Sequence, residues 1–95
     1  MTLSFSNPTR AYDDTRGLIR FIGYDGLNQI LFLLPVAAFH PQGTVKIHEE
    51  RDYLMAFDRL RSRILDIARA AYERKRRPMV ELELKAFGSS LQKMT

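Results

Sequence analysis

The segment 18–34 constrains the fold more than any other part of the chain, because it consists of two apolar runs joined by Asp25-Gly26. Two short apolar runs on either side of an Asp-Gly pair are typical of β-strands joined by a two-residue hairpin turn. With Asp25 and Gly26 in the turn, the register of the hairpin is fixed. The predicted pairs are Gly23 with Asn28, Phe21 with Ile30 and Ile19 with Phe32.

In this register one face of the hairpin is wholly apolar, and the other is apolar except at Arg20 and Gln29. The aliphatic side chains of the second face are Leu18, Ile22, Leu27, Leu31 and Leu33. Apolar patches of this kind are uncommon on monomers, so a cover is expected. Either Val36 and Phe39 fold back over the face, or a second copy of the chain covers it. The second alternative predicts a homodimer with these five residues as the self-association face.

The segment 49–76 has the period of one long amphipathic helix, since apolar residues recur at steps of three and four. These residues are Tyr53, Phe57, Leu60, Ile64, Ile67 and Ala71, flanked by Leu54, Leu65, Ala68 and Tyr72. Acidic residues stand at the start of the segment and basic residues at its end, where each complements the helix dipole. Pro78 disfavours helical geometry at Arg77 and therefore ends the helix.

Alternating apolar and polar residues predict two further strands, one over 3–6 and one over 79–85. A lone hairpin is only marginally stable, so these strands must share one sheet that the helix covers. The predicted fold class is therefore α+β. A small antiparallel β-sheet, made of the central hairpin with an N-terminal and a C-terminal strand, packs against one long amphipathic helix.

Two connecting segments complete the prediction. Pro35 suits the first turn of a helix, so a short helix is expected over 36–40. The segment 9–17 is expected to be irregular, with a turn carried by acidic residues and a glycine. These turn residues are Asp13, Asp14 and Gly17. The 95 residues suffice for one core, so we predict a single domain over 1–95 with a frayed tail over 89–95.

Composition excludes several classes of protein. The chain has no cysteine, which excludes a disulfide framework, a thiolate nucleophile and a Cys-ligated zinc site. The first residues lack the basic and apolar regions of a signal peptide, and the longest apolar run, 30–39, is about half a membrane span. We therefore expect a cytoplasmic protein. The net charge of +4 makes it basic and permits acidic partners.

Several short motifs carry a resemblance to a known family. They are Ser4-Phe5, Arg10-x-Tyr12-Asp13, Arg20-Phe21-x-Gly23-Tyr24-Asp25, Ala56-Phe57-Asp58-x-x-Arg61-x-x-Ile64 and Ala71-Tyr72. From about residue 3 to residue 87 the chain resembles the bacterial domain-of-unknown-function family DUF1488. Ile22 stands where an aromatic residue would be expected in that family. The resemblance implies a small α+β bacterial protein and brings no catalytic activity with it.

Arg61 is a candidate binding residue, because on a helical wheel it falls inside the apolar arc and a buried charge requires a partner. One interpretation is that Arg61 lines a small polar pocket with Asp25 or Asp13, where an anion could be bound by the guanidinium group. The alternative is that its stem covers apolar surface and its charged end reaches water or a carboxylate such as Asp58.

Clustered arginines near the end of the helix suggest a second candidate site. The candidate phosphate contacts are Arg69, Arg74, Arg76 and Arg77. Guanidinium groups at one helix end can neutralise phosphates, which favours nucleic-acid binding. The alternative is that the basic residues stabilise the helix terminus, with Glu73 paired to Arg77 if the helix reaches that far. Aromatic residues for base stacking are missing from this cluster apart from Tyr72, which lies on the apolar face.

Metal binding and catalysis have little support in the sequence. The possible metal ligands His40, His48, Glu49 and Glu50 match no recognised ligand spacing. No nucleophile is paired with a base, no glycine loop could hold a phosphate, and no cofactor motif is present. We therefore predict a non-catalytic interaction or regulatory module without a metal or cofactor. The alternative is a nucleic-acid-binding accessory protein that uses the basic end of the long helix.

Overall fold

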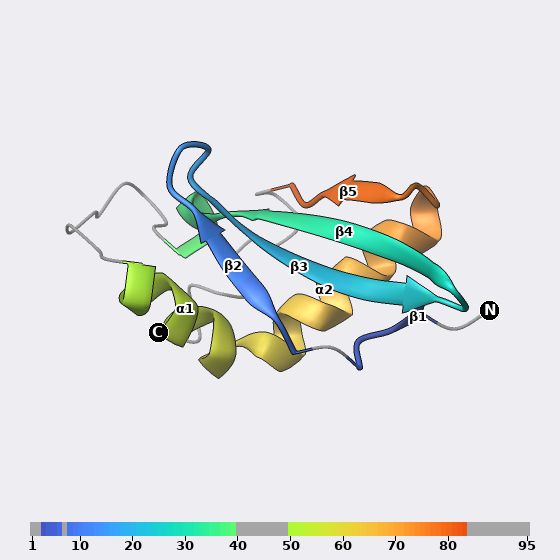
Figure 1. The fold of residues 1–95 in the computed structure, drawn as a ribbon, viewed down its shortest axis with the longest axis horizontal. Coiled ribbons are helices and arrows are strands. Elements are labelled where there is room, and N and C mark those ends of the chain that lie inside the picture. Colours follow the sequence, from blue (N-terminus) through green and yellow to red (C-terminus); the bar gives the residue numbers. More distant parts are fainter. Residues whose placement is uncertain (1–2, 7, 40–49, 84–95) are drawn as a thin grey trace.

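The computed structural model describes residues 3–6, 8–39 and 50–83, and of residues 38 and 39 it describes the backbone only. Five strands and two α-helices with a short 3-10 helix make up this part of the chain (Figure 1). In chain order they are β1 (Leu3–Ser4), β2 (Arg10–Asp13), β3 (Leu18–Asp25), β4 (Asn28–Pro35), η1 (Val36–Phe39), α1 (Glu50–Arg59), α2 (Arg61–Arg74) and β5 (Met79–Glu81). The predicted α+β class is confirmed. The predicted tail over 89–95 lies outside the described residues.

The sheet is mixed, and the prediction that it is wholly antiparallel is wrong. Its strand order is β1-β3-β4-β5, with β2 also paired to β3, and β5 runs parallel to β4. The Leu31 N–H donates to the Pro78 carbonyl and the Leu82 N–H donates to the Leu33 carbonyl, so the parallel ladder continues beyond both ends of β5. Helices α1 and α2 form the crossover between β4 and β5. A crossover that contains a helix returns the chain in the direction in which it left the sheet.

The hairpin between β3 and β4 turns one residue later than predicted. Asp25 pairs with Asn28, so the turn residues are Gly26 and Leu27, and Phe21 lies opposite Phe32. Gly26 has a φ of +65°, which this tight turn requires and which glycine adopts without strain. The predicted pairs are displaced by two residues along β4. Because the displacement is even, each side chain remains on its predicted face.

Strand β2 lies in the segment 9–17 that was predicted to be irregular, so that prediction is wrong. Strand β2 pairs antiparallel with the first half of β3, from Arg10 opposite Phe21 to Asp13 opposite Leu18. The predicted turn at its end is confirmed: Asp13 Oδ1 accepts hydrogen bonds from the backbone of Thr15 and of Arg16. A short strand with one large apolar residue has little sequence signal, and its pairing with β3 stabilises it.

The single helix predicted over 49–76 is two helices in the structure. They meet at Leu60, whose φ of −103° and ψ of 14° depart from helical values. Hydrogen bonds still join Leu60 to Ala56 and Ile64 to Leu60, so the break is a local bend. No proline or glycine occurs between 50 and 74, which is why the sequence does not indicate a bend there. Helix α2 ends at Arg74, four residues before Pro78.

The core lies between one face of the sheet and the two helices, with α2 running behind β3 and β4 in Figure 1. Phe21 stacks on Phe32 with ring centroids 5.3 Å apart and meets Phe57 of α1 edge-on at 5.1 Å. The helix residues buried here are Phe57, Leu60, Ile64, Ala68 and Tyr72, whereas Tyr53, Ile67 and Ala71 are half-buried. The prediction that Phe57, Leu60 and Ile64 are buried is therefore confirmed. In the second half of α2 the buried residues are Ala68 and Tyr72, which were predicted only to flank the apolar series. Each large apolar side chain buried here stabilises the fold by about 1.5–3 kcal/mol.

Candidate functional site

The predicted polar pocket is not assembled in the structure. Asp13 lies opposite Leu18, at the first residue of β3, whereas Asp25 is the last residue of the same strand. Seven residues of extended chain separate these two positions by about 23 Å. Arg61, at the start of α2, forms its hydrogen bonds with neither of them.

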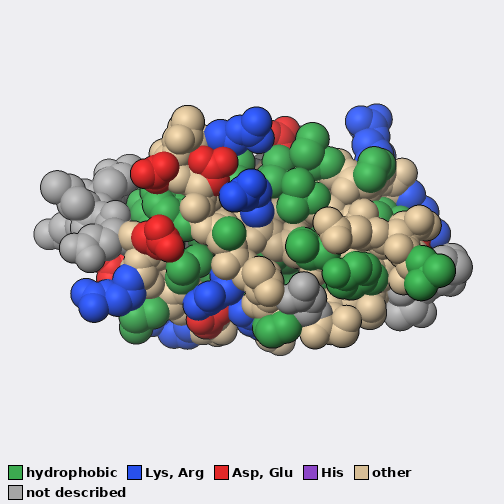
Figure 2. All heavy atoms as spheres, viewed as in Figure 1, with side chains coloured by type: hydrophobic (Ala, Val, Ile, Leu, Met, Phe, Trp, Pro, Cys, Tyr) green, Lys and Arg blue, Asp and Glu red, His purple; other side chains and the backbone are tan. Residues whose placement is uncertain are grey.

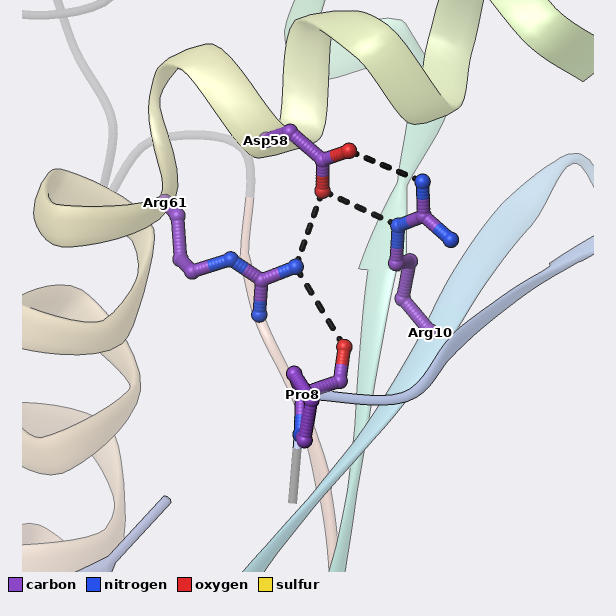
Figure 3. Close-up of polar contacts among 4 residues, drawn as sticks. All are labelled: Pro8, Arg10, Asp58 and Arg61. Atoms are coloured by element: carbon purple, nitrogen blue, oxygen red, sulfur yellow. Dashed lines mark hydrogen bonds and ion pairs between the residues drawn. The ribbon is translucent and has the colours of Figure 1, made fainter. Parts of the chain in front are cut away.

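Arg61 instead belongs to a small charged cluster on the surface (Figure 3). Its Nη2 donates to Asp58 Oδ1 at 2.8 Å and to the Pro8 carbonyl at 3.3 Å, and its guanidinium lies 4.9 Å from the centre of the Phe57 ring. Arg10 of β2 binds the same carboxylate through two bonds, Nε to Oδ1 at 2.9 Å and Nη2 to Oδ2 at 2.8 Å. The alternative interpretation, a partner at Asp58, is the one that the geometry shows.

The cluster ties β2 and the segment before it to the end of α1 and the start of α2. The hydrogen bond from Arg10 lowers the pKa of Asp58 most, and the bond from Arg61 acts in the same direction while partial burial opposes both. The carboxylate is 44% exposed, so water screens these pairs. Both guanidinium groups are directed at Asp58, so the cluster is internally satisfied and has a structural role.

Asp25 is buried in the core, although its place in the Asp-Gly pair had suggested a turn residue. It is 6% exposed, and its Oδ2 accepts a hydrogen bond of 2.6 Å from the hydroxyl of Tyr72 in α2. Its Oδ1 has no hydrogen-bond partner among the residues that the structure describes. The bond to Asp25, followed by burial, raises the pKa of Tyr72. Since the carboxylate faces α2, Asp25 must stay in the strand, which explains why the turn begins one residue later.

The four arginines predicted as phosphate contacts fall into two pairs. Arg69 donates to Asp66 at 3.3 Å and lies over the Phe5 ring, and Arg76 donates to Glu73 at 3.0 Å and lies over the Tyr72 ring. Glu73 was expected to pair with Arg77 if the helix reached that far, but α2 ends at Arg74 and Glu73 pairs with Arg76. Arg74 and Arg77 are exposed and make no ion pair with a described residue. These last two are the free cations of the cluster.

Arg74 and Arg77 line a hollow where the end of α2 meets β5. We call this the basic hollow. Its other basic residues are Arg16 and Lys75, its acidic residues are Glu81 and Glu83, and its apolar wall is formed by Leu33, Ile67, Ala70, Ala71, Met79, Val80 and Leu82. Sequence reasoning missed Arg16, because the turn that carries it is far from α2 in the chain. It also missed the apolar wall, which comes from three different elements.

The second face of the sheet differs from its predicted composition. Leu18 and Leu33 are 7% and 3% exposed, Ile22 and Leu31 are half-buried, and Leu27 at the hairpin turn is fully exposed. Met79 of β5, 55% exposed, joins this face because it pairs with Leu31. Figure 2 shows hydrophobic side chains over the middle and right of this face. We call this surface the open face.

Neither described helix covers the open face. Figure 1 shows the strands in front of α2, and the buried strand residues of the main core belong to the opposite face of the sheet. Val36, one of the two residues predicted to cover the open face, packs against the main core instead. The side chain of Phe39, the other residue, lies outside the described part.

No cluster of three potential metal ligands occurs among the described residues. Glu50 is the first residue of α1 and is exposed, while His40, His48 and Glu49 lie outside the described residues. Within the same described ranges, no helix is both long and apolar enough to span a membrane.

Comparison with known families gives one match. Residues 3–84 match the family DUF1488, which is described as a protein of unknown function. The chain belongs to DUF1488. No curated protein and no solved structure matches it. The match covers every described strand and both helices of this DUF1488 chain, so the basic hollow and the open face both lie within the family's own domain.

Proposed function

We propose that this DUF1488 protein is a non-catalytic interaction module that binds an acidic segment of a partner protein in the basic hollow. The observation that carries the proposal is the combination of free cations and apolar side chains in one concave surface. The sequence supports a non-catalytic role, since it pairs no nucleophile with a base. The lack of cysteine and the resemblance to a bacterial family support action in a bacterial cytoplasm.

Charge favours an acidic partner. Four basic and two acidic side chains line the hollow, which gives a net charge of +2 from the described lining residues. Arg74 and Arg77 have no carboxylate partner among the described residues, so each can donate to a carboxylate of the partner without breaking an existing pair. Because both arginines are exposed, each such ion pair contributes about 0.2–1 kcal/mol.

The apolar wall favours a protein segment over a nucleic acid. Single-stranded nucleic acid is usually held by aromatic rings on which its bases stack. Tyr72, the aromatic residue near the cluster, is 6% exposed and hydrogen-bonded to Asp25, so its ring is not free for stacking. Met79, in contrast, is 55% exposed and offers apolar contact beside the cations. An acidic peptide with one or two apolar side chains matches both features.

The test is a binding titration with three labelled probes, in which fluorescence anisotropy measures the bound fraction of each probe. The first probe is a short peptide of Asp and Glu with one Leu and one Phe, the second replaces its acids by Lys and Arg, and the third is single-stranded oligothymidylate. We expect the acidic peptide alone to bind. The double substitution Arg74→Glu with Arg77→Glu should weaken its binding at least about tenfold, because two charge-assisted contacts become repulsive.

The matched control is the double substitution Arg59→Glu with Arg63→Glu. Both positions are exposed on the helices and lie outside the hollow, and the net charge changes by the same amount. It should leave the affinity within about twofold of wild type. Equal losses in the two variants would show that overall charge, not the hollow, attracts the peptide. Binding of oligothymidylate with a log–log salt slope of about −3 to −4 would support the nucleic-acid alternative instead.

A further inference from the structure

We propose that two copies of this chain associate face to face through the open face, about a two-fold axis that runs along β4. The partner is a second copy because the charges and apolar groups of this face are arranged so that the face complements itself.

Two adjacent rows of side chains define the arrangement. Strand pairing places Ile22 beside Leu31 and Leu31 beside Met79, which forms an apolar row across β3, β4 and β5. The next row along the strands consists of Arg20, Leu33 and Glu81, paired in the same way. All six side chains point to the same face, because directly paired residues share a face and alternate residues along a strand do too.

The row of Arg20, Leu33 and Glu81 has opposite charges at equal distances from β4. Neighbouring strands are about 4.8 Å apart, so the arginine and the glutamate stand about that far from Leu33 on either side. Both charged residues are exposed, and no salt bridge joins either of them to another described residue. Each therefore has its charge available to a partner.

Two copies stacked face to face can be related by a two-fold axis that is parallel to β4 and lies midway between the two sheets. Rotation about this axis places the β3 side of one copy over the β5 side of the other. It places Arg20 of each copy over Glu81 of the other, so two ion pairs of opposite charge form across the interface. The same operation places Ile22 over Met79 and Leu31 over its own symmetry mate. A surface that meets itself in this way is what a closed, isologous dimer requires.

The apolar row supplies the centre of the interface. Ile22 and Leu31 are half-buried in the single chain and Met79 is 55% exposed, so each has apolar surface left to bury. Leu33, at 3% exposure, contributes little more. Arg20 and Glu81 then stand at the rim, where charged pairs mainly fix register and choice of partner.

Sedimentation equilibrium over a dilution series tests the proposal with four samples: wild type, each of two variants, and a mixture of the two variants. Wild type should show a reversible monomer–dimer equilibrium. Arg20→Glu makes both rim charges acidic and Glu81→Arg makes both basic, so each variant alone should dimerise at least about tenfold more weakly. An equal mixture of the two variants should recover the wild-type affinity, because every cross-interface pair then joins an acid to a base.

The mixture separates an interface from any effect within one chain, since a change in folding or local structure would not be repaired by mixing. Both substitutions are at exposed positions, and circular dichroism melts should match wild type. Leu31→Arg, which sets two like charges across the axis, provides a second way to weaken the dimer. A wild type that stays monomeric at high micromolar concentration, or weakened variants that fail to associate when mixed, would overturn the proposal.

The two surfaces adjoin at β5, because Leu33, Met79 and Glu81 also line the basic hollow. Arg20, Ile22 and Leu31 do not line it, so Arg20→Glu tests the dimer without changing the hollow. A chain that loses dimerisation through Arg20→Glu should therefore still bind the acidic peptide. If that variant also lost the peptide, both surfaces would have to be parts of one site, and two independent surfaces would be refuted.

Discussion

Replacing Gly23 by alanine tests how the N-terminal segment packs on the sheet. A Cβ atom at this position would lie 2.8 Å from Cε1 of Phe5 and 3.2 Å from Cε2 of Phe32. Ordinary contacts of this kind begin near 3.4 Å. The Phe5 ring must therefore move by roughly 0.6 Å (3.4 − 2.8), while Phe32 is held by its stacking on Phe21.

Two opposing effects determine the result. Overpacking a filled core costs about 1–3 kcal/mol. Removing a glycine from the unfolded chain stabilises the native state by about 0.4–1 kcal/mol where the backbone tolerates alanine. The difference predicts that Gly23→Ala lowers the free energy of unfolding by roughly 0.5–2 kcal/mol. In a Phe5→Ala background, where the closest ring is gone, the same change should be neutral within about 0.5 kcal/mol.

Urea denaturation of the four proteins in this double-mutant cycle measures the coupling. A coupling of about 0.5–2 kcal/mol between positions 5 and 23 is expected. In thermal melts, each kcal/mol of destabilisation should appear as a drop of about 4–8 °C in Tm. Gly26→Ala is a useful comparison, because no atom lies within 4 Å of its Cβ position and its cost comes from backbone strain alone. If Gly23→Ala stabilised the protein in both backgrounds, Phe5 would not pack over this strand as the structure shows.

Three further predictions concern the core and the two carboxylates. Ile64→Asp should abolish cooperative unfolding in circular dichroism melts, because it buries an unpaired charge at a position with 0% exposure, whereas Arg63→Ala at an exposed position should change the free energy of unfolding by less than about 0.5 kcal/mol. Tyr72→Phe should destabilise the protein at neutral pH in urea melts, since Asp25 loses its hydrogen bond. Because the pKa of Tyr72 is raised on folding, the wild type should lose stability above about pH 10, and this loss should be smaller in the variant. Because the pKa of Asp58 is lowered on folding, its carboxylate contributes to the free energy of unfolding above about pH 4, and this contribution is lost as the pH falls further. Asp58→Asn should therefore make stability depend less on pH on the acid side, and an unchanged acid dependence would contradict the cluster in Figure 3.

The sequence alone was sufficient for those features that depend on the spacing of side chains along the chain. The period of two in segment 18–34 placed Ile19, Phe21 and Phe32 on one face, and they form the core with Phe57. The period of three and four placed Ile64 in the same core. These periods are local geometric properties of strands and helices, so they are visible before any tertiary contact is known. The motifs around Gly23 and Arg61 likewise sufficed to place the chain in its family.

The tertiary structure decided every feature that depends on residues far apart in the sequence. The hairpin turn moved by one residue because Asp25 is bound by Tyr72, 47 positions later. The direction of β5 follows from the crossover through both helices, which no pattern within β5 reveals. Arg61 found its carboxylate in a cluster completed by Arg10, 48 positions before Asp58.

The two proposed surfaces have the same origin. The basic hollow joins residues of a turn, a helix and an edge strand, and the row from Arg20 to Glu81 crosses three strands. Each of these side chains has an unremarkable place in its own element. Their relation exists only once strand pairing and helix packing have brought distant segments together, because contact depends on position in space, and sequence spacing fixes position only within a single element.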